Sequence, residues 1–163
     1  MTTSPIALLA RLAGSGLDFV VIGGIAVVAQ GHIRTTRDLD ITYATDQPNL
    51  DALGRVLVEL DARLRGVAEL VPFVPDGRTL RSAELLTLET THGALDLLAH
   101  PPGAPPYREL KGRAERIEIE ARTVTVASLD DLVAMKRAAG RPRDLEDIEA
   151  LEALRRLRRE RAG

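Results

Sequence analysis

The chain has 163 residues, of which 45% are hydrophobic and 28% charged, and its formal net charge is −2. This length predicts one domain with a sizeable core, because two domains would each be too small to bury enough apolar surface. The charge excludes a polycation that binds nucleic acid through its overall charge, and the absence of cysteine excludes disulfides and thiolate zinc sites.

The composition also bears on the cellular compartment. The first residues lack the basic region, apolar stretch and cleavage site of a secretory signal. The longest nearly apolar run, residues 19–29, contains two glycines and is well short of the roughly 20 residues that span a bilayer. We therefore expect a cytoplasmic protein that does not contact a membrane. The three histidines form no His-x-x-x-His pair, so nothing favours a zinc hydrolase.

The first half of the chain predicts helices that alternate with strands. Ser4 is expected to cap a helix that Pro5 opens, and two glycines follow it. Residues 18–22 predict a strand, 24–31 a short helix and 38–43 a second strand. A long helix that opens at Pro48 has apolar residues at every third or fourth position as far as Leu64, so we expect it to cover the sheet.

The second half predicts further strands and two helices. Prolines and a glycine indicate a loop over 66–82, and residues 85–90 and 94–98 predict strands joined by a short turn. Residues 101–106 predict a stiff exposed connection, and 116–127 one edge strand. Ser128 and Asp131 form a capping box for a helix over 129–139. Pro142 opens the last helix, whose inward-facing residues are expected to be Leu145, Ile148, Leu151, Leu154 and Leu157.

The most informative motif joins Gly23-Gly24 to the triplet Asp38-Leu39-Asp40. Successive side chains of a strand point to opposite faces, so Asp38 and Asp40 emerge on the same side, roughly 6.6 Å apart along the chain. Two such carboxylates can share divalent cations, and Mg²⁺ takes its other ligands from water and substrate phosphates. The glycines let the backbone approach a phosphate closely, and the helix behind them offers free N–H groups.

These residues resemble the signature of the polymerase-beta nucleotidyltransferase superfamily, which runs Gly-Gly or Gly-Ser, a spacer, and Asp-x-Asp or Asp-x-Glu. The resemblance implies an α+β fold, a mixed twisted sheet packed against helices, in a single domain over 1–163 with a core at 17–127 and a helical part at 128–163. Many members have Ser after the first glycine. Because this chain has Gly24 there, any phosphate contact at that position comes from the main chain.

The superfamily also needs a third carboxylate on a later strand, and Asp96 stands in that context within Ala94-Leu95-Asp96-Leu97. An unpaired carboxylate in such an apolar strand is costly to bury, and a nearby cation removes that cost. The resemblance thus implies a metal-dependent enzyme of the nucleotidyltransferase class, with Asp38, Asp40 and Asp96 holding two Mg²⁺ ions, or Mn²⁺ in their place. Asp96 is expected to help deprotonate the acceptor.

Residues near the C-terminus resemble one particular branch of this superfamily. Residues 135–144, with Lys136, Arg141, Arg143 and Asp144, are similar to the Lys, Arg and Asp motif of the AbiEii-type nucleotidyltransferase toxins of toxin–antitoxin systems. That branch implies an NTP substrate, an RNA acceptor such as the tRNA 3′ end, and a cognate antitoxin. It also implies nucleotide binding by Lys136, which is expected among the catalytic residues, and by Arg141 and Asp144. Arg34 and Arg37 are further candidates for phosphate binding, because arginine binds phosphate with two parallel hydrogen bonds.

Several alternatives stay open. Lys136 fits a surface lysine on an amphipathic helix, Asp144 fits an acid favoured by a helix N-terminus, and loop arginines are usually solvated. The acceptor is alternatively a small molecule of the antibiotic type, which needs an acidic pocket; Glu118 and Glu120 are candidates for its lining, although their alternation fits an exposed strand better. A third hypothesis is a non-catalytic module that binds a nucleotide or a partner. A dinucleotide-binding fold is excluded, because Gly-x-Gly-x-x-Gly is absent.

Overall fold

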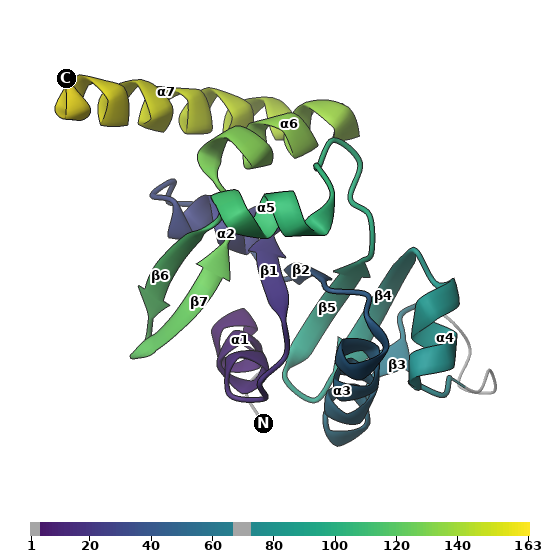
Figure 1. Cartoon of the computed structure of the whole chain (residues 1–163). Helices are drawn as coiled ribbons and strands as arrows, with labels where there is room; N and C mark the ends of the chain where they lie inside the picture. The colour runs from purple at the N-terminus through teal and green to yellow at the C-terminus, as the bar shows by residue number, and fades with distance from the viewer. Residues whose placement is uncertain (1–3, 67–72) are drawn as a thin grey trace.

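A computed structural model describes residues 4–66 and 73–163, and these form a mixed seven-stranded sheet with helices packed on it (Figure 1). The strands lie in the order β3-β4-β5-β2-β1-β7-β6. The α+β architecture predicted from the sequence is therefore confirmed. Of the helices in the described ranges, none combines the length and the apolar character needed to cross a bilayer.

Three central strands fix the positions of the acidic residues. β1 (Phe19–Ile22) runs antiparallel to β2 (Leu39–Tyr43), with Ile22 opposite Asp40. β5 (Gly93–Leu98) runs parallel to β2, and Asp40 pairs in register with Asp96. These strands are short and almost entirely apolar, apart from the two aspartates and Thr42. The register therefore brings two carboxylates, which are 56 positions apart in the sequence, to the same place in the sheet.

The outer strands complete the sheet on both sides. β4 (Leu85–Thr90) forms a hairpin with β5, and β3 (Arg63–Leu64) pairs with β4. On the other side β7 (Arg122–Val126) lies beside β1, and β6 (Glu115–Ile119) forms the edge. The prediction of one strand over 116–127 is wrong. Glu120 and Ala121 both have positive φ, 46° and 64°, and form the turn of a hairpin. The sequence did not indicate this turn, because the glycine or asparagine usual at such positions is absent from it.

The helices begin where their capping residues predict. The Ser4 and Ser128 hydroxyls accept hydrogen bonds from backbone N–H groups at the start of α1 (Pro5–Ala13) and α6 (Leu129–Ala139), and Asp46 does the same for α3 (Gln47–Glu59). The short α2 (Gly23–Ala29) lies between β1 and β2 in the chain, and α7 (Asp144–Ala162) is the last element. These helices were predicted to within a few residues, except that α3 ends at Glu59 and the Leu64 expected to continue it lies in β3 (Arg63–Leu64).

Two helices were not predicted. α4 (Gly77–Ser82) lies in the region expected to be loop, where Asp76 caps it. Of the rest of that prediction, residues 73–76 are in neither helix nor strand, and 67–72 lie outside the described residues. α5 (Tyr107–Arg113) follows the proline-rich connection. It is anchored to the sheet by Asp18, whose Oδ1 accepts a hydrogen bond from Tyr107 Oη and pairs with Lys111 Nζ, both at 2.7 Å.

The last helix is less buried than its pattern predicts. Leu151 is fully buried, but Leu145 and Leu157 are 62% and 50% exposed, so the expected inward face is wrong at both of its ends. α7 packs along α6, and its C-terminal half runs on beyond that helix (Figure 1). Only the middle of α7 therefore finds an apolar surface to cover.

Candidate functional site

Asp40 and Asp96 lie side by side on β2 and β5. Burial raises the pKa of Asp40 to about 7 from its ordinary 3.8, and the negative charges of Asp96 and Asp38 act in the same direction. The positive charge of Lys136 opposes them. The site thus concentrates negative charge in a partly desolvated place, and a cation bound there would relieve that repulsion.

Gly23 and Gly24 leave room for the Asp40 carboxylate and for the loop before β2. Gly23 has a φ of +68°, and a Cβ at this position would overlap the Asp40 carboxylate. A Cβ on Gly24 would lie 2.6 Å from Thr36 Oγ1 and 2.7 Å from an Arg34 guanidinium nitrogen. The sequence analysis assigned both glycines to close approach of a phosphate. The structure gives each a second reason, which is contact with the loop and strand that carry the aspartates.

Asp96 has a partner that the sequence did not reveal. Arg65 Nη2 donates to Asp96 Oδ1 at 2.7 Å and to the carbonyl oxygen of Leu88 at 3.0 Å. Arg65 follows β3 directly, and its Nε lies 3.6 Å from Glu89 Oε2. Asp96 is partly buried, with 21% of its side chain exposed, and it already has a guanidinium as a positive partner in addition to the cation expected from the sequence. Because the pairing of β3 with β4 brings them together, no local pattern could have indicated it.

Facing these carboxylates, the start of α7 carries a second acidic pair. Lys136 Nζ lies 3.3 Å from Asp144 Oδ1 and 3.0 Å from Asp147 Oδ2. The Lys136 side chain is only 10% exposed, so the alternative of a solvated surface lysine is wrong. Asp144 is likewise buried and bonded rather than a simple helix-terminal acid. Asp147 was missed, although its three-residue spacing from Asp144 places both on one helix face.

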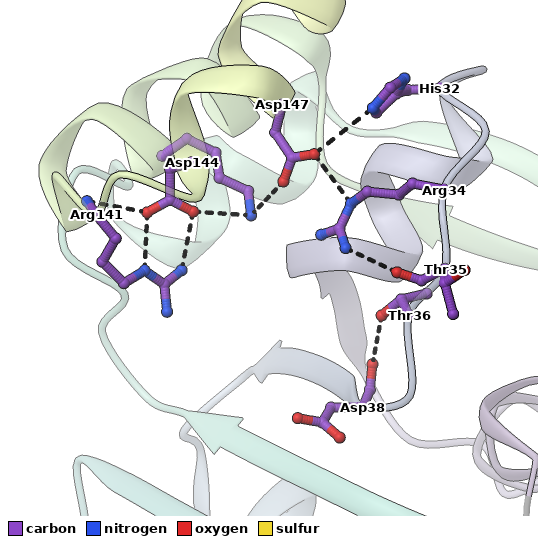
Figure 2. A network of polar contacts seen from close by, with 9 residues as sticks. His32, Arg34, Thr35, Thr36, Asp38, Arg141, Asp144 and Asp147 are labelled. Atoms are coloured by element: carbon purple, nitrogen blue, oxygen red, sulfur yellow. Dashed lines mark hydrogen bonds and ion pairs between the residues drawn. The ribbon is translucent and has the colours of Figure 1, made fainter.

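Asp147 and Asp144 tie three segments together (Figure 2). Asp147 Oδ1 lies 2.9 Å from Arg34 Nε and 3.8 Å from His32 Nε2, so it fixes the loop before β2. The guanidinium of Arg141 donates to both oxygens of Asp144, at 2.8 and 3.1 Å. Burial disfavours the charged form of Asp144, but the hydrogen bonds from Arg141 and the charge of Lys136 outweigh it and lower its pKa to about 2.

A cavity of about 520 Å³ lies between the two acidic groups. It brings together every predicted site residue except Gly23, which lies directly beneath Asp40. These lining residues are Gly24, Arg34, Arg37, Asp38, Asp40, Asp96, Lys136, Arg141 and Asp144. Arg143, which belongs to the same C-terminal motif, also lines it, as do Glu146 and Asp147, which were not predicted. Glu118 and Glu120 are exposed on β6 and its turn and do not line this cavity, so the interpretation of an exposed strand is confirmed over that of an acidic lining.

The cavity carries five basic and six acidic side chains, so the two signs nearly balance. Within residues 4–66 and 73–163, no three carboxylate, imidazole or thiolate groups already converge as a complete metal cage would. The donor set still suits Mg²⁺ or Mn²⁺, which need only a few carboxylate oxygens and take water and phosphate oxygens as the other ligands. Asp40 pairs in register with Asp96, and this pair of neighbouring carboxylates is the structural observation that favours a cation there.

Comparisons with known proteins relate this geometry to a fold. The chain matches no protein-family model, and no curated protein resembles it significantly in sequence. The solved structure of ANT(2'')-Ia in complex with adenylyl-2''-tobramycin is similar, with a TM-score of 0.58, 19% identity and coverage of 99% of this chain and 100% of that one. The lincosamide antibiotic adenylyltransferase LnuA, bound to lincomycin, gives a TM-score of 0.61 at 15% identity, with coverage of 94% and 98%.

An antigenic nucleotidyltransferase-like protein from Paracoccidioides brasiliensis gives a TM-score of 0.52 at 17% identity, with coverage of 91% of this chain and 73% of that one. The chain therefore has the nucleotidyltransferase fold, as the glycine and aspartate motif predicted. The AbiEii-type branch finds no counterpart among these structures, and the residues of the site remain predictions.

Proposed function

We propose that this protein is a metal-dependent nucleotidyltransferase that moves a nucleoside monophosphate from an NTP to an acceptor hydroxyl. The observation that carries the proposal is the arrangement of Asp38, Asp40 and Asp96 along one wall of a cavity whose opposite wall carries Lys136 and Arg141. Carboxylates suit divalent cations, and the cationic groups suit phosphate oxygens. The nucleotidyltransferase fold of the neighbouring structures supports the same chemistry.

In this reaction the acceptor oxygen forms a bond to the α-phosphorus of the NTP. The bond from that phosphorus to the oxygen that bridges it to the β-phosphorus breaks, and pyrophosphate leaves with the bonding electron pair. The hydroxyl proton passes to Asp96, the carboxylate that Arg65 already orients at 2.7 Å. The other residues contribute mainly by positioning the reactants and by compensating charge.

Asp38, Asp40 and Asp96 would hold two Mg²⁺ ions, or Mn²⁺ in their place. Bound cations of this kind neutralise the charge on the phosphoryl and leaving-group oxygens. Arg37 is exposed at the cavity, and the side chain of Arg141 is 47% exposed. Both can therefore reach a triphosphate from the protein surface. Arg34 is held by Asp147 at 2.9 Å, which fixes its position near Gly24.

The acceptor has two candidates. Resemblance of residues 135–144 to the AbiEii-type toxins favours an RNA end, such as the tRNA 3′ terminus, and a cognate antitoxin. The exposed Arg37 and Arg143 at the rim could contact an RNA backbone. The neighbouring antibiotic-modifying structures favour a small hydroxylated molecule instead, because they match this chain over nearly its whole length.

One experiment distinguishes these acceptors. The protein is incubated with each α-labelled NTP and Mg²⁺, together with total RNA, an aminoglycoside or a lincosamide in separate reactions. Labelled RNA supports the RNA acceptor, and a labelled antibiotic supports the small-molecule acceptor. NTP binding without transfer to any acceptor would support the non-catalytic module and contradict the proposal.

A further inference from the structure

A second, smaller cavity, with a volume of about 240 Å³, also has Asp40 in its wall. Most of its wall is apolar and comes from segments far apart in the sequence. The apolar side chains that form it are those of Ile22, Leu98, Pro101, Pro102, Leu132, Met135 and Ala139. We call this cavity the apolar slot. Three charged residues, Asp40, Lys136 and Arg141, line both the slot and the larger polar cavity, so the two spaces adjoin.

β5 and α6 form two walls of the slot. Leu98 lies two residues beyond Asp96 on β5, so both side chains leave the same face of the sheet. Leu132, Met135 and Ala139 are spaced three and four residues apart on α6, which places them along one helix face next to Lys136. Leu98 and Met135 are only partly buried although they pack on the apolar core. Their remaining exposed surface faces an open space that a ligand can fill.

The third wall is the proline-rich loop, which packs directly on α6. Gly103 has a φ of +84°, and a Cβ there would lie 2.5 Å from the Ala134 carbonyl oxygen and 2.8 Å from Ala138 Cβ. Only glycine therefore allows this approach of the two backbones. Proline rings fix φ at 101 and 102. The slot is thus built in advance rather than formed by loose side chains.

The polarity and size of the two cavities indicate what spans them. A ligand lying across Asp40 and Lys136 has an anionic, cation-binding part in the polar cavity and an apolar part in the slot. The slot is smaller than the roughly 300–1,000 Å³ of pockets that enclose a whole drug-sized ligand. It therefore suits a single ring system. An NTP combines these two parts, because it has an anionic triphosphate at one end and a flat nucleobase at the other.

We propose that the apolar slot binds the nucleobase of the NTP, an inference that rests on the proposed function because it assumes that the polar cavity takes the triphosphate. None of the chain's two phenylalanines and two tyrosines lines the slot, and tryptophan is absent. The base is therefore held between proline rings, Met135 and Leu98 rather than stacked on an aromatic ring.

Met135 provides a direct probe, because the only other methionine is Met1. Protein labelled with ¹³C at the methionine methyl groups gives two resonances, and a Met135→Leu variant identifies the one in the slot. The labelled protein is titrated with ATP, GTP, CTP, UTP and inorganic tripolyphosphate, each with Mg²⁺. We expect an NTP to shift the Met135 resonance through the ring current of its base. Tripolyphosphate, which has no base, should shift it much less.

Calorimetry on the same samples separates failure of this inference from failure of the proposed function. If neither the NTPs nor tripolyphosphate bind, the proposed function fails together with the inference. If an NTP binds and the Met135 methyl does not move, or moves equally with tripolyphosphate, the base lies elsewhere and only the inference is overturned.

A Met135→Ala variant gives an independent measurement. We expect it to weaken NTP binding about fivefold through lost apolar contact and to leave tripolyphosphate binding unchanged. The matched control is Val58→Ala on α3, which truncates an exposed apolar side chain that lines neither the polar cavity nor the slot. Unchanged NTP affinity in Met135→Ala, or an equal loss for both ligands, would overturn the assignment.

Discussion

Asp40→Asn should stabilise the metal-free protein at alkaline pH, although it removes a residue central to the proposed activity. Asn keeps the shape of the side chain and removes its charge. The folded protein holds a proton on Asp40 up to a pKa of about 7, whereas the unfolded chain releases it near 3.8. The contribution of Asp40 to stability is therefore most favourable below about pH 4. It is lost as the pH rises to 7, above which the carboxylate is charged in both states.

The size of the effect follows from that pKa difference. The rise from 3.8 to about 7 corresponds to at most about 4 kcal/mol in the free energy of unfolding. Asp40 lines an open cavity, where water reduces charge repulsion, so we expect about 1–2 kcal/mol. In a protein of this length that difference raises the melting temperature by about 2–8 °C.

The assay is thermal unfolding of both proteins in a chelator at pH 8 and at pH 4.5. We expect Asp40→Asn to melt higher at pH 8 and the difference to shrink at pH 4.5. Asp130→Asn, which neutralises a carboxylate that is 68% exposed, is the control and should change the melting temperature little. A variant less stable than wild type at pH 8, or an equal difference at both pH values, would refute the reasoning about charge repulsion.

Three further predictions follow from the site. Adding Mg²⁺ or Mn²⁺ at pH 8 should raise the melting temperature of wild type but not of Asp40→Asn, and an equal rise in both would place the cation elsewhere. In urea titrations Gly23→Ala should cost about 2–4 kcal/mol, because it adds a clash with Asp40 to the strain of a positive φ, whereas Gly16→Ala, with a similar φ but open space, should cost about 1 kcal/mol. Asp147→Ala should lower nucleotidyl transfer at least tenfold, with recovery in Asp147→Glu, because it frees Arg34 and leaves Lys136 with Asp144 alone; equal activity in the two variants would contradict a positioning role for this carboxylate.

Local sequence signals were enough for the part of the site that one short segment builds. The alternation around Asp38 and Asp40 and the preceding apolar run predicted both strands, and the glycines between them matched a turn that the structure confirms. The Ser128 cap gave the bounds of α6 correctly. Each of these features depends on neighbours within a few residues, which is the range that sequence patterns report.

Features that depend on distant contacts were missed. α5 is anchored by Asp18, which is 89 residues from Tyr107, and its own sequence carries little amphipathic pattern. The 120–121 turn uses positive φ at Glu and Ala, which turn statistics disfavour. Arg65 reaches Asp96 only because β3 pairs with β4. For α5 and for Asp96, the residue that fixes the structure is distant in the sequence, and the sequence alone does not show that the two lie close together in the fold.

Transfer of label from an α-labelled NTP, measured for wild type and Asp40→Asn with and without Mg²⁺, tests the central claim most directly. The account predicts transfer by wild type only when Mg²⁺ is present. It also predicts no transfer by the variant, even though the variant is the more stable protein at pH 8. Loss of activity in a more stable protein cannot be attributed to unfolding. Full activity in Asp40→Asn, or transfer by wild type in a chelator, would contradict the metal-dependent role of these carboxylates.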